Sequence, residues 1–165
     1  MSSSFTYSGS YTVVDVRKVM DMVHADARMV AQATGLRTQA YVDRVMGDVQ
    51  TFAESGYLEK IEIRLVAGGK NVKVWSYDVN EKVSGLSSDR PGGNLSSVNA
   101  NRMSFTLYYS DKWKAMADTD QEKFRNKLAI NWTTTTDDLS VAHLSVSDER
   151  AYVSNSYGVT RKVYK

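Results

Sequence analysis

The chain has 165 residues, a formal net charge of +2 and a hydrophobic fraction of 42%, which indicate one globular domain with a sizeable core. It contains no cysteine, which excludes disulfide bonds, thiolate metal sites and a cysteine nucleophile. Basic and acidic residues are interspersed, unlike the one-sided basic face typical of nucleic-acid-binding domains, and no apolar run approaches the ~20 residues that span a bilayer.

The N-terminal segment has alternating aromatic and polar residues. Phe5, Tyr7, Tyr11 and Val13 are separated by Ser and Thr, which fits either a short edge strand or a mobile tail. The segment lacks the basic start and apolar block of a signal peptide. We therefore expect a soluble, cytoplasmic protein and leave both structural alternatives open.

Two amphipathic helices are predicted next. Thr12 or Asp15 can accept backbone N–H groups at the start of the first helix, and Gly35 can end it in the left-handed conformation. Thr38 is a good N-cap for the second helix, which ends at Gly56. Apolar residues recur at helical spacing in both segments, namely Val16, Val19, Met20, Val23, Ala27, Val30 and Ala31, then Tyr41, Val42, Val45, Met46, Val49, Phe52 and Ala53.

Gly47 lies inside the second predicted helix. Glycine there weakens a helix by about 1 kcal/mol relative to alanine. We interpret Gly47 as a position of close packing between helices rather than as a functional kink.

The period changes to two after the second helix. Residues 57–79 form two alternating apolar runs around Gly68 and Gly69, which predicts a β-hairpin with a tight turn. Residues 84–100 are rich in Ser and Gly and contain the one proline, Pro91, so we expect a long loop.

Residues 102–110 are predicted to form a strand with one buried face. Met103, Phe105, Leu107 and Tyr109 alternate with Arg102, Ser104, Thr106 and Tyr108. We interpret this strand as the seam between a fixed body and a C-terminal segment that is able to move.

The C-terminal third has weaker periodicity. Residues 119–122 read as a capping box, Thr-Asp-Gln-Glu, which predicts a short helix ending near Ala129. One or two irregular strands are expected between Trp132 and Val146. Residues 150–153 and 159–164 look like a terminal hairpin. Together the elements predict an α+β fold in which amphipathic helices back an antiparallel sheet.

No group of residues points to catalysis, a metal site or a cofactor. His24 and His143 have no acidic or histidine neighbour at ligand spacing, and the pairs Asp137-Asp138 and Asp148-Glu149 point to opposite faces if they lie in strands. The glycine pairs lack the lysine and context of a phosphate loop. A binding or adaptor protein is therefore favoured over an enzyme, although an enzyme with an unrecognised site remains an alternative.

An exposed sheet edge can bind an extended peptide, because the main chain of the peptide completes the ladder. The strand at residues 102–110 could supply such an edge if the C-terminal segment can leave it. The alternative is a static interaction domain whose C-terminal strands are permanently docked.

The order of two long helices, a hairpin and the run SFTLYYSDKW at residues 104–113 resembles the HORMA domain. The runs at residues 5–20, 55–65 and 149–164 more narrowly resemble the bacterial HORMA family found in CBASS antiphage operons. The similarity covers essentially the whole chain. It implies a single domain over residues 1–165, with an N-terminal tail (1–11), a core (12–112) and a C-terminal safety belt (113–165).

The resemblance also implies a function. In this family the belt closes around a short partner peptide, the closure motif, which lies as a strand beside the sheet edge. The closed form activates a cGAS/DncV-like nucleotidyltransferase that makes cyclic oligonucleotides, and an AAA+ remodelling ATPase reopens it through the N-terminal region. Neither nucleic acid nor a membrane is expected as a direct partner.

Carried onto this sequence, the resemblance assigns two groups of site residues. The peptide-binding edge comprises Arg102, Met103, Ser104, Phe105, Thr106, Leu107, Tyr108 and Tyr109. The residues of the belt that clamp the peptide are Trp132, Tyr152, Tyr157 and Val159. One departure is that eukaryotic HORMA domains have a helix where this chain has the loop at residues 84–100. A helix is instead expected inside the belt, so the movable part could begin only after Ala129.

Overall fold

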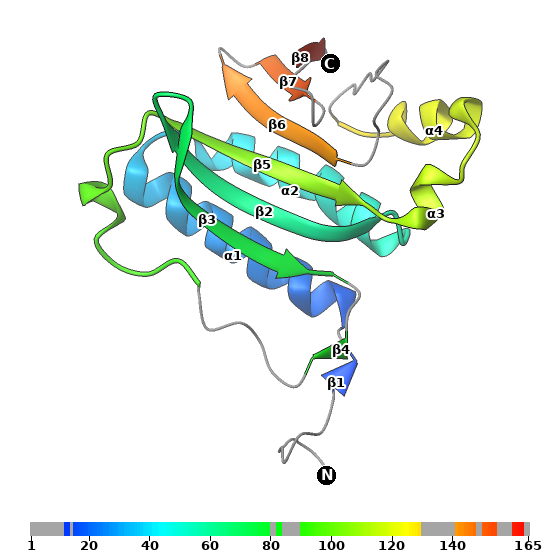
Figure 1. The fold of residues 1–165 in the computed structure, drawn as a ribbon, viewed down its shortest axis with the longest axis horizontal. Coiled ribbons are helices and arrows are strands. Elements are labelled where there is room, and N and C mark those ends of the chain that lie inside the picture. The colour runs from blue at the N-terminus through cyan, green and yellow to red at the C-terminus, as the bar shows by residue number, and fades with distance from the viewer. Residues whose placement is uncertain are drawn as a thin grey trace.

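The computed structural model describes the backbone of residues 12–13, 15–79, 82–83, 90–129, 141–147, 150–154 and 160–163, and the side chains of residues 15–79 and 90–129. Over these residues the chain forms an antiparallel sheet with two long helices behind one of its faces (Figure 1). This is the predicted α+β architecture.

The two helices begin and end as their sequences predict. Helix α1 (Val16–Thr34) starts at Asp15, whose carboxylate accepts the backbone N–H of Arg17 at 3.0 Å, and it ends at Gly35 with a φ of 67°. Helix α2 (Gln39–Glu54) starts at Thr38, whose hydroxyl accepts a backbone N–H at 3.2 Å. These local caps fix both helices before any tertiary contact is considered.

The interpretation of Gly47 as a close-packing position is wrong. Gly47 is exposed, and a Cβ placed there would meet no atom within 4 Å. The residue faces away from α1, so close helix packing does not explain it.

The predicted hairpin is confirmed. Strands β2 (Leu58–Ala67) and β3 (Lys70–Asp78) pair antiparallel around Gly68 and Gly69, whose φ angles are 57° and 78°. Two consecutive positive φ angles define the tight turn that matches the twist of the paired strands, and glycine adopts them without strain.

The main sheet has the strand order β3-β2-β5-β6-β7-β8. Strands β7 (Arg150–Ser154) and β8 (Thr160–Val163) pair antiparallel, which confirms the terminal hairpin. The other two strands are β5 (Arg102–Tyr109) and β6 (Val141–Ser147), and β6 is the part of the expected irregular strands that is described.

The connection from β3 to β5 must cross the helix layer, because both strands run antiparallel to β2 and therefore parallel to each other. Its first part, β4 (Lys82–Val83), pairs with β1 (Thr12–Val13), so at least Val13 of the N-terminal segment lies in a short strand. Its second part contains the 3₁₀ turn η1 (Leu95–Ser97), which packs on α1 with Leu95 buried.

A buried carboxylate fastens this crossover. Asp26 of α1 is 1% exposed and accepts hydrogen bonds from the hydroxyl of Tyr77 at 2.8 Å and from Arg90 at 3.0 and 2.7 Å. The crossover thus covers α1 through Arg90 and Leu95, in the interval where a helix is expected in eukaryotic HORMA domains.

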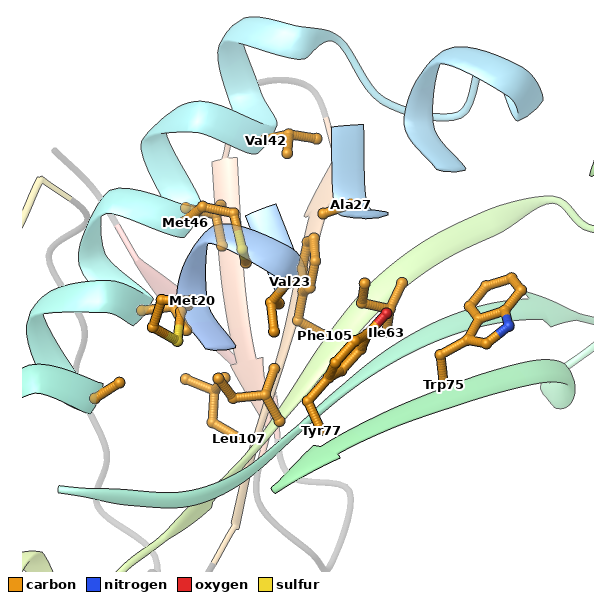
Figure 2. Close-up of a cluster of buried hydrophobic side chains, with 14 of the residues drawn as sticks. Met20, Val23, Ala27, Val42, Met46, Ile63, Trp75, Tyr77, Phe105 and Leu107 are labelled. Carbon is orange, nitrogen blue, oxygen red and sulfur yellow. The ribbon is translucent and has the colours of Figure 1, made fainter. Parts of the chain in front are cut away.

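The core lies between the helices and the sheet. Figure 2 shows the side chains of Met20 and Val23 from α1, and Met46 from α2, meeting Phe105 and Leu107 from β5. All five are buried. At roughly 25 cal/mol per Å² of apolar surface, this burial is the main stabilising contribution to the fold.

The segment after β5 differs from its prediction. A short helix α3 (Asp111–Lys114) precedes α4 (Asp118–Arg125), and the N-cap of α4 is Ala117 without a side-chain hydrogen bond. The capping box at Thr119 is therefore wrong, because Thr119 lies inside the first turn. Helix α4 also ends at Arg125, and turns with backbone bonds to Phe124 and Arg125 continue the chain toward Ala129.

None of the helices in the part of the chain that the structure describes is long and apolar enough to cross a membrane.

Candidate functional site

The candidate site is the side of β5 that faces away from β2. Strand β5 pairs with β2 along its whole length on one side and with β6 on the other, where the register runs from Ser104 opposite Ser145 to Tyr108 opposite Val141. The edge on which we expected a partner peptide is thus occupied by the chain's own β6 (Figure 1).

The faces of β5 differ from the predicted pattern of one buried face. Met103, Phe105 and Leu107 point into the core as predicted, but Ser104 and Thr106 are also buried, at 9% and 0% exposure. Both are short side chains that stand opposite longer ones of β2, because Ser104 is in register with Arg64 and Thr106 with Glu62. Alternation of residue types does not reveal burial produced by neighbouring strands.

An aromatic cluster closes the end of β5. Trp113 of α3 is 1% exposed, and its ring stacks on Tyr109 at 5.3 Å between centroids. Phe52 of α2, Tyr57 and Phe124 of α4 lie edge-on to the Trp113 ring at 5.0, 5.1 and 5.8 Å. Such tilted and stacked aromatic pairs add to the stabilisation from burial.

Two hydrogen bonds fasten the residues after Trp113 to the body. The buried amide of Gln121 donates to the backbone carbonyl of Trp113 at 2.7 Å. The backbone N–H of Ala129 donates to the carboxylate of Asp48 on α2 at 2.9 Å. The chain up to Ala129 is therefore held by α2 and by the aromatic cluster.

A polar network lies on the sheet face opposite the helices. Glu62 of β2 is 6% exposed and accepts hydrogen bonds from Arg64 at 3.0 and 2.5 Å, from Tyr108 at 3.1 Å and from Ser76 at 3.3 Å. The ammonium of Lys60 is 3.5 Å from the same carboxylate. Residues from β2, β3 and β5 meet at this one group, and the pattern of each strand alone did not predict it.

The charges of the network hold Glu62 ionised. Burial alone raises the pKa of Glu62, but the hydrogen bond and charge of Arg64, with smaller effects of Tyr108 and Lys60, bring that pKa below its usual value. Burial and the charge of Glu62 raise the pKa of Tyr108. The network thus holds the hydroxyl of Tyr108, a residue of β5, against the carboxylate of Glu62.

The remaining predicted site residues are placed only in part. Trp132, Tyr157 and Val159 lie outside the described residues, and Tyr152 is placed by its backbone, opposite Ser145 of β6. His143 is likewise placed by its backbone, opposite Thr106.

His24 has a structural partner. Its Nε2 lies 2.7 Å from Asp43, which also accepts a hydrogen bond from Arg28. Within the described ranges, no three His, Cys, Asp or Glu residues come together as a metal site.

Comparisons with known proteins agree with this architecture. The family model described as Bacterial HORMA domain family 1 matches residues 1–165. Two proteins named CD-NTase-associated protein 7, one from Escherichia coli strain KTE188 and one from Escherichia coli, are each 32% identical over 165 residues, covering 99% of this chain and 99% of their own.

A solved structure is similar in fold. A chain of the E. coli MS115-1 HORMA:CdnC:Trip13 complex aligns with a TM-score of 0.53 and 15% identity, covering 82% of this chain and 81% of that chain. At that identity the likeness concerns the fold alone.

Proposed function

Because the chain belongs to bacterial HORMA domain family 1, we propose that it is an adaptor that switches when an extended peptide replaces β6 beside β5. The edge would comprise residues 102–109, which pair through their backbones. In this proposal the chain binds and does not catalyse.

The observation that carries the proposal is the β5–β6 ladder. It involves the five register pairs from Ser104–Ser145 to Tyr108–Val141. A guest strand would remake these backbone hydrogen bonds nearly one for one, and each contributes only about 0.5–1.5 kcal/mol net. Exchange of β6 for a guest therefore has the small free-energy difference that a two-state element needs.

We further propose that the movable belt begins after Ala129 rather than at Trp113. The buried Trp113, the ring of Phe124 and the Ala129–Asp48 hydrogen bond tie everything before it to the body. The belt would then comprise residues 130–165. Trp132, Tyr152, Tyr157 and Val159 are its proposed clamps.

The names of similar proteins suggest the partners. The relatives at 32% identity are named for association with a CD-NTase, and the solved chain of similar fold belongs to a HORMA:CdnC:Trip13 complex. We propose that this chain, when closed around a peptide, activates a cGAS/DncV-like nucleotidyltransferase in the cytoplasm as part of antiphage defence. An AAA+ ATPase would reset it.

The N-terminal segment is a suitable handle for such an ATPase. Strand β1 pairs only with β4, over two register pairs among the residues described. Force on residues 1–11 would first break this short pair and then act on α1 and on the crossover fastened to it by Arg90 and Asp26.

A disulfide lock between β5 and β6 tests the proposal. Ser104 and Ser145 are registered partners, and antiparallel partners have Cα atoms ~4.5–5.5 Å apart, within the range of a disulfide. Since the chain has no cysteine, the double variant Ser104→Cys/Ser145→Cys can form one defined bond. Oxidised, it should fail to activate the co-expressed nucleotidyltransferase, measured as cyclic oligonucleotide synthesis, and reduction should restore activation.

The matched control is Ala67→Cys/Lys70→Cys, which bridges registered residues beside the β2–β3 turn. It should activate equally well oxidised and reduced. Full activation by the oxidised β5–β6 lock would contradict switching and favour a static interaction domain.

A further inference from the structure

Two arginines flank the ring of Tyr41 at the start of α2, and a third lies near one of them. The guanidinium carbon of Arg37 lies 5.7 Å from the centroid of the Tyr41 ring, and that of Arg44 lies 6.0 Å from it. Arg102, at the start of β5, is near enough that its charge adds to burial in lowering the pKa of Arg37. We call Arg37, Arg44, Arg102 and Tyr41 the arginine cluster.

The cluster lacks an anion among the residues that the structure describes. None of the ion pairs found there involves Arg37, Arg44 or Arg102. The Nε atoms of Arg37 and Arg44 and the hydroxyl of Tyr41 are buried without a hydrogen-bond partner, although Tyr41 itself is 5% exposed. Buried donors are normally paired, so each unpaired one calls for an explanation.

The cluster stands at one end of the proposed peptide edge. Arg102 is the first residue of β5 and lies two positions before Ser104, where the ladder with β6 ends. A strand advances about 3.3 Å per residue. A peptide paired along β5 therefore reaches the cluster one or two residues beyond the position opposite Ser104.

We propose that the arginine cluster binds the carboxylate of an Asp or Glu side chain at that end of the partner peptide. Guanidinium groups and a phenol hydroxyl are donors, and their planar N–H groups match the two oxygens of a carboxylate. Binding would pair the unsatisfied donors and relieve the repulsion between Arg37 and Arg102. The inference rests on the proposed function and specifies which peptides are recognised.

Selection from a displayed library of random, unmodified peptides on the full chain tests this inference. Peptides that bind the wild-type protein should share one acidic position near one end. An acidic peptide from that pool should bind about tenfold or more tightly than its amide analogue, since hydrogen bonds to charged groups exceed neutral ones by roughly that factor. The difference should shrink as salt is added.

Variants of the exposed Arg102 test most directly whether the cluster selects an acidic residue in the peptide. The Arg102→Gln variant should still select peptides, but these should no longer share an acidic position. The Arg102→Glu variant should select peptides with Lys or Arg at that position.

The Tyr41→Phe variant removes an unpartnered hydroxyl, so its melting temperature should be unchanged or higher. Its affinity for the acidic peptide should nevertheless be lower. Lys73→Gln, the same charge change at an exposed position on β3, is the matched control and should retain the acidic preference.

The outcomes separate this inference from the proposed function. Selected peptides without a shared acid would overturn the arginine cluster as a carboxylate site and leave peptide binding intact. Selection of no peptide would overturn both. If the acidic preference emerges only in Asp148→Asn/Glu149→Gln, the cluster serves the chain's own acids and the inference fails.

Discussion

At the scale of single residues, the two Arg–Asp pairs that tie α1 to other segments differ in what surrounds them. Asp26 is 2% exposed at its side chain and holds Arg90 of the crossover, whereas Asp43 and Arg28 are 45% and 46% exposed. Solvent screens an exposed pair, and a buried carboxylate left without its partner is costly. The two pairs therefore have different importance for stability.

We expect Arg90→Gln to destabilise the protein on the order of 2 kcal/mol, because it leaves Asp26 buried with fewer hydrogen bonds. The half-exposed Arg90 keeps the figure below that of a fully buried pair. Denaturant unfolding measures the effect, and Arg28→Gln, at the exposed pair, is the control and should change little. Equal losses in the two variants would contradict the role assigned to Asp26.

The Glu62 network makes a pH-dependent contribution to stability. The pKa of Glu62 is lowered below 4.5 in the folded state, so its contribution is fully present above that pH and is lost as the pH falls through the folded value. Unfolding of the wild type and of Glu62→Gln should be compared between pH 7 and about pH 3. The wild type should lose its advantage over the variant below pH 4.5. A constant difference across this range would show that the charge of Glu62 is not involved.

Gly47 offers a stabilising substitution. It lies in the middle of α2, exposed and with open space where a Cβ would lie, so nothing offsets the helix penalty of glycine. We expect Gly47→Ala to raise stability by about 1 kcal/mol, measured by thermal unfolding. Ser55→Ala, just past the helix, provides a comparison at which no such gain is expected. A loss on Gly47→Ala would mean that α2 needs a flexible point there.

At the scale of elements, the ring of Phe124 joins α4 to the aromatic cluster. Phe124 contacts Phe52 and Tyr57 at 5.1 and 4.9 Å between centroids. Since Phe124 is partly buried, Phe124→Ala should cost about 2 kcal/mol and should release α4 first. Hydrogen exchange should show lost protection over Asp118–Arg125 with little change in β2. Exposed Glu122→Ala is the control, and unchanged protection of α4 in the Phe124 variant would place its anchor elsewhere.

The elements that the sequence predicts correctly are those whose signals are local. Asp15, Gly35 and Thr38 bound the helices through caps within a few residues, and the Gly68-Gly69 turn fixes the hairpin register. The terminal hairpin of β7 and β8 is likewise predicted from two runs that lie close together in the sequence. Each of these patterns is complete within one or two neighbouring segments.

The errors arise where contacts between segments far apart in the sequence determine the structure. Thr119 satisfies a capping pattern, yet the N-cap of α4 lies two residues earlier, at Ala117, whose carbonyl accepts the backbone N–H groups of the first turn. Burial of Ser104 and Thr106 depends on the partners of β5, and the Glu62 network combines three strands. The arginine cluster joins residues 37, 44 and 102, and no spacing in the sequence brings them together.

At the scale of the whole molecule, the family expected from the sequence is confirmed over residues 1–165. The strand at residues 102–109, which we interpreted from its alternation as a boundary, lies inside the sheet between β2 and β6. Helices α1 and α2 pack on β2, β3 and β5, and α3 and α4 close one end of that body. The body so defined ends near Ala129.

The proposed boundary at Ala129 can be tested by truncating the chain there. A chain ending at Ala129 keeps the two helices, the three strands and the aromatic cluster, so we expect it to melt cooperatively. It would also expose the free edge of β5, and exposed edges pair with other strands. We therefore expect concentration-dependent association in sedimentation experiments, which the full-length chain should not show. A peptide of residues 130–165 added in trans should suppress the association by taking the β6 position. A truncated chain without a cooperative transition would mean that the C-terminal residues are part of the fixed body, and no segment would then be free to exchange with a guest.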